Sequence, residues 1–332
     1  MAIGPTHGAG LDGPKKTVVA AIIVPGPKPS GDQETRPVGT MTGALLTWSD
    51  GLLAHGVTHG AMESTGAYWT PGFNLRESDF QGLLVHAAPI KAGPGRQTDV
   101  HEAAWSADRL PHGLLKASLV PPVGQRARRD LTRQRSPVVR QRASRVNRVQ
   151  KVRERANIKL ARVATDGLGR SGRALVEALM AGQASPTARA ELAKGRLRET
   201  REPLTKALEG RVHAHPRCVL TERLGQIDRL DETIARVDAP IEAYWAPVEE
   251  ALGLRETIPG VARQTAEIMV AEMGTAMSRV PTADHRAAWA GVAPGNHDSA
   301  GKRRSSQTRK GNRPLGVALN QAAPAAARPK HP

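Results

Sequence analysis

The chain has little of what secreted, disulfide-bonded or membrane proteins need. It contains a single cysteine, Cys218, in 332 residues, which excludes an internal disulfide framework and a zinc site built only from cysteine. It has no run of about 18 apolar residues that could span a bilayer. Its N-terminus lacks the basic region and apolar segment of a signal peptide. We therefore expect a cytoplasmic protein with no membrane contact.

Aromatic residues are also scarce, with five Trp, two Tyr and two Phe. The hydrophobic core must therefore consist mainly of Leu, Val, Ile and Ala. A chain of this length is nevertheless long enough for two or three domains with a sizeable core.

Acidic residues do not balance basic ones, because the net charge is +17. Residues 1–120 contain nine Lys and Arg against ten Asp and Glu, a net charge of −1, so the other 212 residues carry +18. Solubility or Arg-rich codon usage is one explanation of a basic composition. A charge confined to one part of the chain instead favours a polyanionic partner.

The first 120 residues have an α/β pattern. Residues 17–24 are a β-branched apolar run that predicts a strand, and residues 56–62 and 83–86 are shorter candidates. Residues 41–53 and 69–77 have helical spacing between these runs. The sum predicts a mixed or parallel sheet covered by helices.

The rest of the chain is predicted to be helical. Between residues 125 and 155, eleven Arg and one Lys face only two acids, and the apolar spacing predicts a basic amphipathic helix with a kink at Pro137. Apolar residues recur every three or four positions from Leu220 to Ile241, which indicates either a coiled-coil seam or a helix packed on its own domain. We place domains at 1–120, 121–250 and 251–332. The last contains a Pro259-Gly260 hairpin, helices over 264–273 and 283–289, and a poorly ordered tail from Ala322.

Four carboxylates in the first domain are candidate metal ligands. Asp12 comes just before the first predicted strand, Glu63 follows an apolar stretch, and Asp99 and Glu102 lie three apart where a helix begins. Residues at this spacing share a helical face. If the sheet brings these positions together, their repulsion needs cations, and hard oxygen ligands select Mg²⁺ or Mn²⁺ for phosphodiester chemistry. Taken singly, each acid is better interpreted as a solvated surface residue, so the metal site depends on their convergence.

Two features of the third domain suggest phosphate chemistry. A Pro-Gly hairpin between helices exposes backbone N–H groups to a phosphate, although a tight turn without a ligand has the same sequence. Ser299 precedes Ala300-Gly301 in an open loop, where nearby cations can stabilise its alkoxide and a pentavalent phosphorus. A common loop serine is the alternative. The cations that follow it are Lys302, Arg303, Arg304, Arg309, Lys310 and Arg313.

Together these motifs resemble the insertion-sequence 110 family of transposases, in its 1111 branch, also called DEDD transposases. The resemblance covers nearly the whole chain, and the ordered series is more specific than any one member. The matching stretches are Gly10-Leu-Asp-Gly-Pro-Lys-Lys, Met62-Glu-Ser-Thr-Gly, Pro94-Gly-Arg-Gln-Thr-Asp, His112-Gly-Leu-Leu-Lys, Ile258-Pro-Gly-Val, Ala271-Glu-Met-Gly, Trp289-Ala-Gly-Val, Ser299-Ala-Gly-Lys-Arg and Lys310-Gly-Asn.

The resemblance implies a RuvC-like RNase H fold for residues 1–120, a coiled-coil segment, and a mainly helical C-terminal transposase domain. It implies that Asp12, Glu63, Asp99 and Glu102 hold Mg²⁺ or Mn²⁺, although the family usually has Asp where this chain has Glu102. It also implies that Ser299 is the nucleophile and forms a covalent phosphoserine with DNA. The family continues well beyond Lys310-Gly-Asn, so we expect a C-terminally truncated copy.

The resemblance also implies partners. Family members are homo-oligomers, here a dimer or tetramer, in which domains of different protomers share an active site, and a structured non-coding bridge RNA chooses target and donor DNA. We expect such a protein at the bacterial nucleoid. One rival is a RuvC-like nuclease that uses metal-activated water, and another is a decayed nucleic-acid-binding remnant. The predicted nucleic-acid contacts are Arg128, Arg129, Arg133, Gly260, Lys302, Arg303, Arg304 and Lys310.

Overall fold

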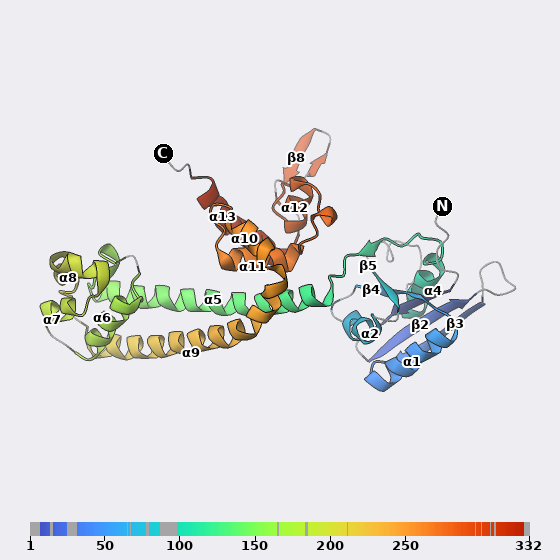
Figure 1. Cartoon of the computed structure of the whole chain (residues 1–332), viewed down its shortest axis with the longest axis horizontal. Helices are drawn as coiled ribbons and strands as arrows, with labels where there is room; N and C mark the ends of the chain where they lie inside the picture. Colours follow the sequence, from blue (N-terminus) through green and yellow to red (C-terminus); the bar gives the residue numbers. More distant parts are fainter. Residues whose placement is uncertain are drawn as a thin grey trace. The chain divides into compact units, whose positions relative to one another are not determined.

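The computed structural model of the protein describes residues 7–13, 16–24, 32–64, 66, 68–77, 80–86, 98–164, 166–182, 185–210, 212–295, 297–299, 301–305, 307–308 and 310–328. The chain divides into two compact units, an N-terminal unit of residues 1–120 and a helical unit of residues 121–332 (Figure 1). The segments that we predicted as second and third domains thus lie in one compact unit.

The N-terminal unit contains a six-stranded mixed sheet of order β3-β2-β1-β4-β5-β6. The first strand pairs antiparallel with β2 and parallel with β4, β4 pairs parallel with β5, and the outer pairs are antiparallel. This confirms the predicted mixed sheet. The strands are β1 Gly8–Asp12, β2 Thr17–Val24, β3 Asp32–Gly39, β4 His59–Glu63, β5 Gln81–Val85 and β6 Ala117–Ser118.

Helices cover both faces of this sheet. Because successive strand residues face opposite sides, Ala20 and Ile22 pack with α1 (Thr42–Ala54), whereas Ala21 and Ile23 pack with α4 (Asp99–Arg109). Helix α2 (Trp69–Arg76) lies beside α1. Burial on both faces explains why residues 17–24 form an unbroken apolar run rather than an alternating one.

Three strands of this sheet were not predicted, namely β1, β3 and the two-residue β6. We placed Asp12 just before the first strand, but it is the last residue of β1. The Gly-Ala-Gly sequence of β1 has low strand propensity, which hid it. Strand β3 is an edge strand, exposed except at Val38 and interrupted by Pro37, so it has no apolar alternation to detect.

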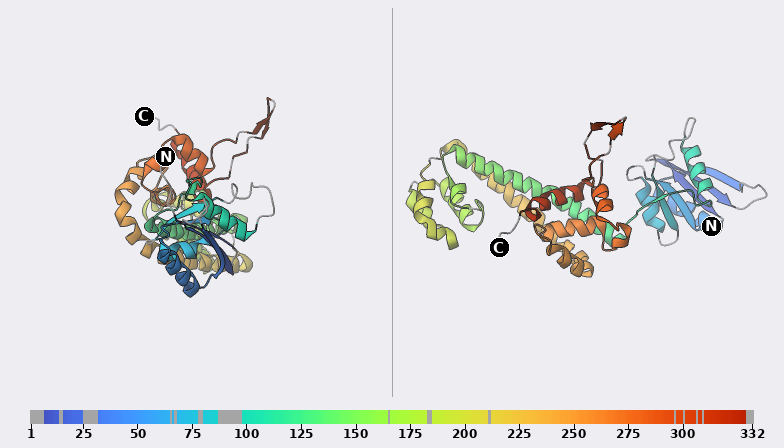
Figure 2. Two further views of the ribbon diagram at one scale, coloured as in Figure 1. Left: turned by 90° about the vertical axis from the view of Figure 1, so that its right-hand side faces the viewer. Right: turned by 90° about the horizontal axis from the view of Figure 1, so that it is seen from above.

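The helical unit is built on two long helices, α5 (Val123–Arg155) and α9 (Ala214–Trp245), which run side by side (Figures 1 and 2). Helix α5 continues through Pro137. The predicted seam of α9 therefore packs within the chain, with Leu220, Leu224 and Ile227 buried in one core cluster. The elements between the two helices are η1 Leu160–Arg162, α6 Arg170–Met180, α7 Pro186–Glu191, η2 Gly195–Thr200 and α8 Arg201–Ala207.

A second core cluster joins the far end of α9 to the C-terminal elements, with Ile241, Leu252 and Leu315 among its buried residues. We expected a poorly ordered tail from Ala322, but Ala322 is buried within α13, which continues to Ala326. No helix in the described part of the chain has the length and apolar character of a bilayer span. The elements are η3 Ala246–Val248, α10 Glu249–Glu256, α11 Arg263–Met273, η4 Met277–Arg279, α12 Ala283–Ala290, β7 His297–Ser299, β8 Lys302–Ser305 and α13 Arg313–Ala326.

Candidate functional site

Three of the four predicted acids meet at one edge of the sheet. Asp12 ends β1 and Glu63 ends β4, and these strands are parallel with Leu11 opposite Met62, so both carboxylates emerge at the same edge. Glu102 reaches them from the first turn of α4. Ligand oxygens of the three side chains all lie within 4.8 Å of one another. Oxygens on opposite sides of one Mg²⁺ are about 4.2 Å apart, so the group fits such an ion.

The close approach of α4 depends on Gly10. A Cβ on this residue would lie 2.1 Å from the carbonyl oxygen of Ala103 and 2.8 Å from the amide nitrogen of Ala107. Ala103 and Ala107 are themselves fully buried. Three small residues therefore let helix and strand touch, and this contact brings Glu102 beside Asp12.

The clustering changes the acidity of Asp12. Burial, then hydrogen bonding and repulsion from Glu63 and then Glu102, raise the pKa of its carboxyl group from 3.8 to about 8. Glu63 and Glu102 are 7% and 9% exposed, so water screens this repulsion weakly. Without a cation the group retains a proton near neutral pH.

This pKa predicts proton release on metal binding. Because the carboxyl pKa is raised on folding, its stabilisation of the metal-free fold is complete below about pH 4 and is lost as pH rises to about 8. Mg²⁺ must displace the proton, so its apparent affinity increases with pH up to about 8. Calorimetry in two buffers of different ionisation enthalpy should show about one proton released per ion at pH 7 and almost none at pH 9.

The control for this measurement is Asp108→Asn, on the exposed side of α4, which should leave proton release unchanged. A proton count that does not vary between pH 7 and pH 9 contradicts the raised pKa of Asp12.

Asp99 lies outside the group. It is the first residue of α4 and is exposed, whereas Thr98 provides the N-cap. The predicted role of Asp99 as a fourth ligand stays a prediction. The Pro94-Gly95-Arg96 turn lies outside the described residues.

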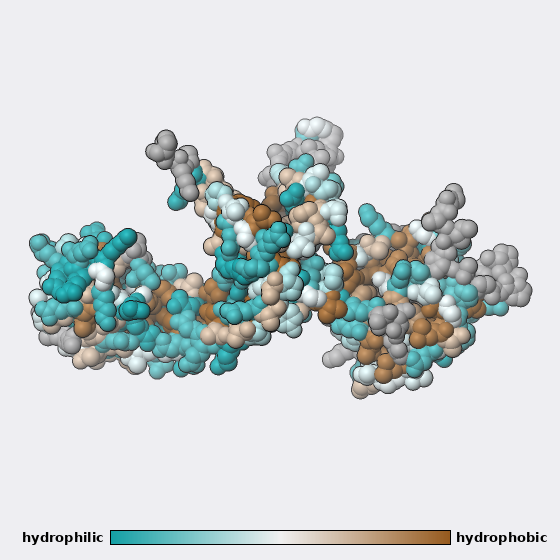
Figure 3. Space-filling model, in the orientation of Figure 1, coloured by the Kyte–Doolittle hydropathy of each residue, from teal (hydrophilic) through white to brown (hydrophobic). Residues whose placement is uncertain are grey.

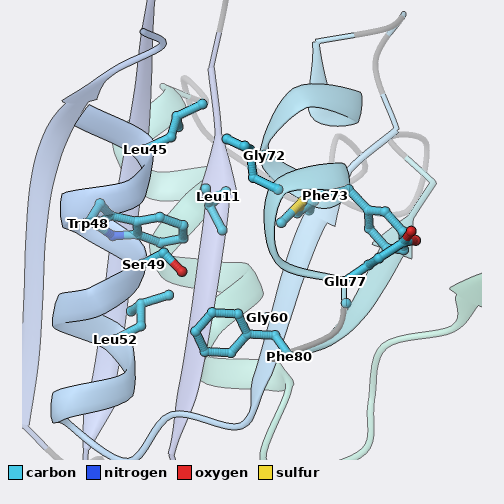
Figure 4. Close-up of a pocket in the computed structure, with 13 residues that line it drawn as sticks. Leu11, Leu45, Trp48, Ser49, Leu52, Gly60, Gly72, Phe73, Glu77 and Phe80 are labelled. Atoms are coloured by element: carbon cyan, nitrogen blue, oxygen red, sulfur yellow. The ribbon is translucent and has the colours of Figure 1, made fainter. Parts of the chain in front are cut away.

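The apolar pocket of the N-terminal unit does not coincide with the cluster of three acids. Figure 4 shows Trp48 and Leu52 of α1 facing Phe73 and Phe80 across Leu11. None of the three clustered acids lines this pocket. Its lining is mostly apolar apart from Ser49 and Glu77, and it offers no cation to a phosphodiester.

Ser299 lies in a two-stranded hairpin. It ends β7 and pairs with Lys302 at the start of β8, and Gly301 between them has φ of +75°, a value that favours glycine. The sequence predicted an open loop, and the structure has a tight hairpin turn. Lys302 and Lys310 are exposed, as phosphate contacts require, and Arg303 and Arg304 lie in β8.

The other predicted phosphate contacts have structural roles within the chain. Arg128 donates to the Tyr244 carbonyl, Arg129 donates to the Ala271 carbonyl at 3.0 Å, and Arg133 pairs with Glu272. Gly260 has φ of +82°, and a Cβ there would lie 2.6 Å from Ala325 of α13. These contacts are enough to explain why such residues stand at these positions. Their binding of nucleic acid stays a prediction.

A basic groove in the helical unit was not predicted. It lies between α5, α11 and α13, has a volume of about 420 Å³, and its lining includes Arg133, Arg140 and Arg313 but no acid. The buried Glu272 was also missed. Its burial could have been predicted from its position, because this acid lies between Ala271 and Met273 on an otherwise apolar part of α11.

Comparisons with known proteins identify the family of the chain. A transposase family model of the DEDD, IS110 type matches residues 9–157, and the model of the Transposase IS116/IS110/IS902 family matches residues 254–332. No curated protein matches the chain. The first match contains Asp12, Glu63 and Glu102, and the second contains Ser299. The two models match in the order expected for one transposase, and the chain belongs to the IS110 family of transposases.

Proposed function

We propose that this transposase cuts and rejoins DNA through Ser299, with Mg²⁺ or Mn²⁺ held by Asp12, Glu63 and Glu102, and by Asp99 in the active assembly. The observation that supports the metal role most directly is the convergence of three carboxylates within 4.8 Å at the sheet edge. Such a buried group of like charges is unfavourable by itself and becomes favourable with a divalent cation.

The proposed reaction has two balanced steps. The Ser299 hydroxyl loses its proton and attacks a DNA phosphorus, and the bond from that phosphorus to a deoxyribose oxygen breaks while the leaving oxygen gains a proton. A hydroxyl of a second DNA end then attacks the phosphoserine, and the serine oxygen leaves and regains a proton. The bound ion supplies stabilisation of the negative charge on the phosphoryl oxygens.

The nucleic-acid surface that we propose lies on the helical unit. The groove lined by Arg133, Arg140 and Arg313 is suitable for a phosphate backbone. Arg148 and Lys151 of α5 are exposed as well, and hydrophilic residues dominate the part of this unit around α6–α8 on the face in Figure 3. We propose DNA and a structured bridge RNA as ligands, and a homodimer or homotetramer as the assembly.

Ser299→Ala tests the nucleophile. With donor and target DNA, adjacent transcribed RNA and Mg²⁺, the wild-type protein should form a protein–DNA adduct that survives denaturing electrophoresis. Ser299→Ala should form none, because alanine has no oxygen to esterify. The matched control is Ser305→Ala in the paired strand of the same hairpin, which should retain the adduct.

Two other outcomes identify the rivals. Cleavage without an adduct in wild type, unaffected by Ser299→Ala, indicates a nuclease that uses metal-activated water. Salt-dependent nucleic-acid binding without any cleavage in Mg²⁺ indicates a decayed copy that only binds.

A further inference from the structure

We propose that Glu272 is a positioning residue, which fixes the base of the Ser299-bearing segment to α5. The proposal rests on the nucleophilic role proposed for Ser299, and its contacts all lie within the helical unit. We call the base of this segment, formed by Trp289, Gly291, Gly311 and Asn312, the neck.

The neck is a close backbone contact. The chain leaves α12 at Gly291 and returns at Gly311, where a Cβ would lie 2.3 Å from the Gly291 nitrogen and 2.6 Å from the Trp289 carbonyl oxygen. The backbone N–H of Asn312 donates a 2.8 Å hydrogen bond to the carbonyl oxygen of Trp289. The β7–β8 hairpin lies between these points in the chain, so both ends of the segment that carries it start from the neck.

Glu272 joins the neck to α5. Its side chain is fully buried, and Arg133 binds it with two hydrogen bonds, Nε to Oε1 and Nη2 to Oε2, each 2.8 Å long. The Asn312 side-chain amide donates to Oε2 at 2.7 Å. A carboxylate without such partners is too costly to bury, and bidentate arginine pairing fixes its orientation.

The helix that carries Glu272 is itself fastened to α5. Gln125 donates to the Ala271 carbonyl at 3.1 Å, and Arg129 donates to it at 3.0 Å. The Arg129 guanidinium also lies 6.0 Å from the centre of the Trp289 ring. Helix α5 therefore supports the neck in two ways, by holding α11 and by the contact of Arg129 with Trp289. A precisely placed nucleophile needs such a second layer of support.

The side chain of Asn312 allows this contact to be tested separately from folding. Its Oδ1 accepts from the Leu315 amide at 3.1 Å and caps α13, while its Nδ2 donates to Glu272. Asn312→Asp retains a cap of equal quality but places a second carboxylate against Glu272. The double variant Glu272→Gln, Asn312→Asp restores the bond between these two side chains with donor and acceptor exchanged, but it loses the Arg133 Nη2 hydrogen bond to the same atom of residue 272.

Amide hydrogen exchange of the full chain is the primary measurement. In Asn312→Asp, amides of the neck and of β8 should exchange about tenfold faster or more, because a charge-assisted hydrogen bond is lost. Amides of α6 are the internal reference and should not change. The double variant should return part of the protection.

Strand transfer is the second measurement. A misplacement of about 1 Å costs about a hundredfold in rate, so Asn312→Asp should lose transfer to that extent with unchanged DNA affinity. The double variant should recover part of it. Wild-type exchange at the neck in Asn312→Asp, or no recovery in the double variant, overturns the proposal.

The two proposals can fail separately. If exchange responds as expected but transfer in wild type does not need Ser299, the neck restraint stands and the nucleophile assignment falls. If Asn312→Asp accelerates exchange in α6 equally, the unit has unfolded. Asn312→Ser then decides, because it keeps a cap oxygen and removes the longer side-chain amide that donates to Glu272. Faster exchange at the neck supports the proposal, and unchanged exchange refutes it.

Discussion

Glu63→Gln should lower Mg²⁺-dependent DNA cleavage by about a thousandfold while making the metal-free protein more stable. A bound divalent cation contributes several kcal/mol to stabilising phosphoryl transfer, and each 1.36 kcal/mol is a factor of ten in rate. The same change removes a negative charge beside Asp12, whose pKa Glu63 raises. Between pH 6 and pH 8, the metal-free variant should therefore have a higher free energy of unfolding than the metal-free wild type.

The opposite signs of these two effects separate metal binding from misfolding. Urea unfolding in EDTA measures the stability of the metal-free protein, and cleavage of labelled DNA in Mg²⁺ measures the activity. Glu102→Gln should behave in the same way, because Glu102 also raises the Asp12 pKa. A variant that loses cleavage and stability together would contradict this account of the cluster.

Asp99→Asn is the informative comparison. If Asp99 joins the metal in the active assembly, as the family resemblance implies, its loss of cleavage equals that of Glu63→Gln. If the three clustered acids suffice, an exposed residue at the start of α4 should cost no more than about tenfold, the scale of an outer-sphere contact.

The elements that could be predicted from the sequence are those whose pattern is local. Strand β2 matches its predicted range 17–24. Helix α1 is shifted from its predicted range by one residue, and α2 ends one residue before its predicted end. Periodicity and helix starts are written in neighbouring residues. Strand β1 could not be predicted in this way, because its glycines are needed for close contact with a helix about 90 residues later in the chain.

The site was predictable in its residue types but not in its electrostatics. The sequence predicted that Asp12 and Glu63 meet only if the sheet joins the segments that carry them, because spacing alone does not show it. The proton retained by Asp12 depends on burial, which spacing does not reveal either. Likewise, eleven arginines between residues 125 and 155 predicted a nucleic-acid surface. Several of them instead bind acids far away in the sequence, such as Arg135 with Glu267 and Arg142 with Asp231.

Gly10→Ala should remove the metal site without touching a ligand. The added Cβ would lie 2.1 Å from the backbone oxygen of Ala103, and neither partner is a flexible side chain that can move away. Helix α4 must shift, and Glu102, the residue before Ala103, must shift with it. We expect an unfolding free energy lower by about 3 kcal/mol or more and loss of measurable Mg²⁺ binding by calorimetry.

The matched control for Gly10→Ala is Gly60→Ala on the neighbouring strand β4. Gly60 is opposite Ala9 in the sheet, and a Cβ on it would meet no atom within 4 Å. This substitution should leave Mg²⁺ affinity unchanged and stabilise the fold by about 0.4–1 kcal/mol, because alanine reduces the freedom of the unfolded chain. Equal behaviour of the two variants means that α4 does not need contact with β1. Loss of Mg²⁺ binding in Gly10→Ala alone means that the three acids converge only because residue 10 lacks a side chain.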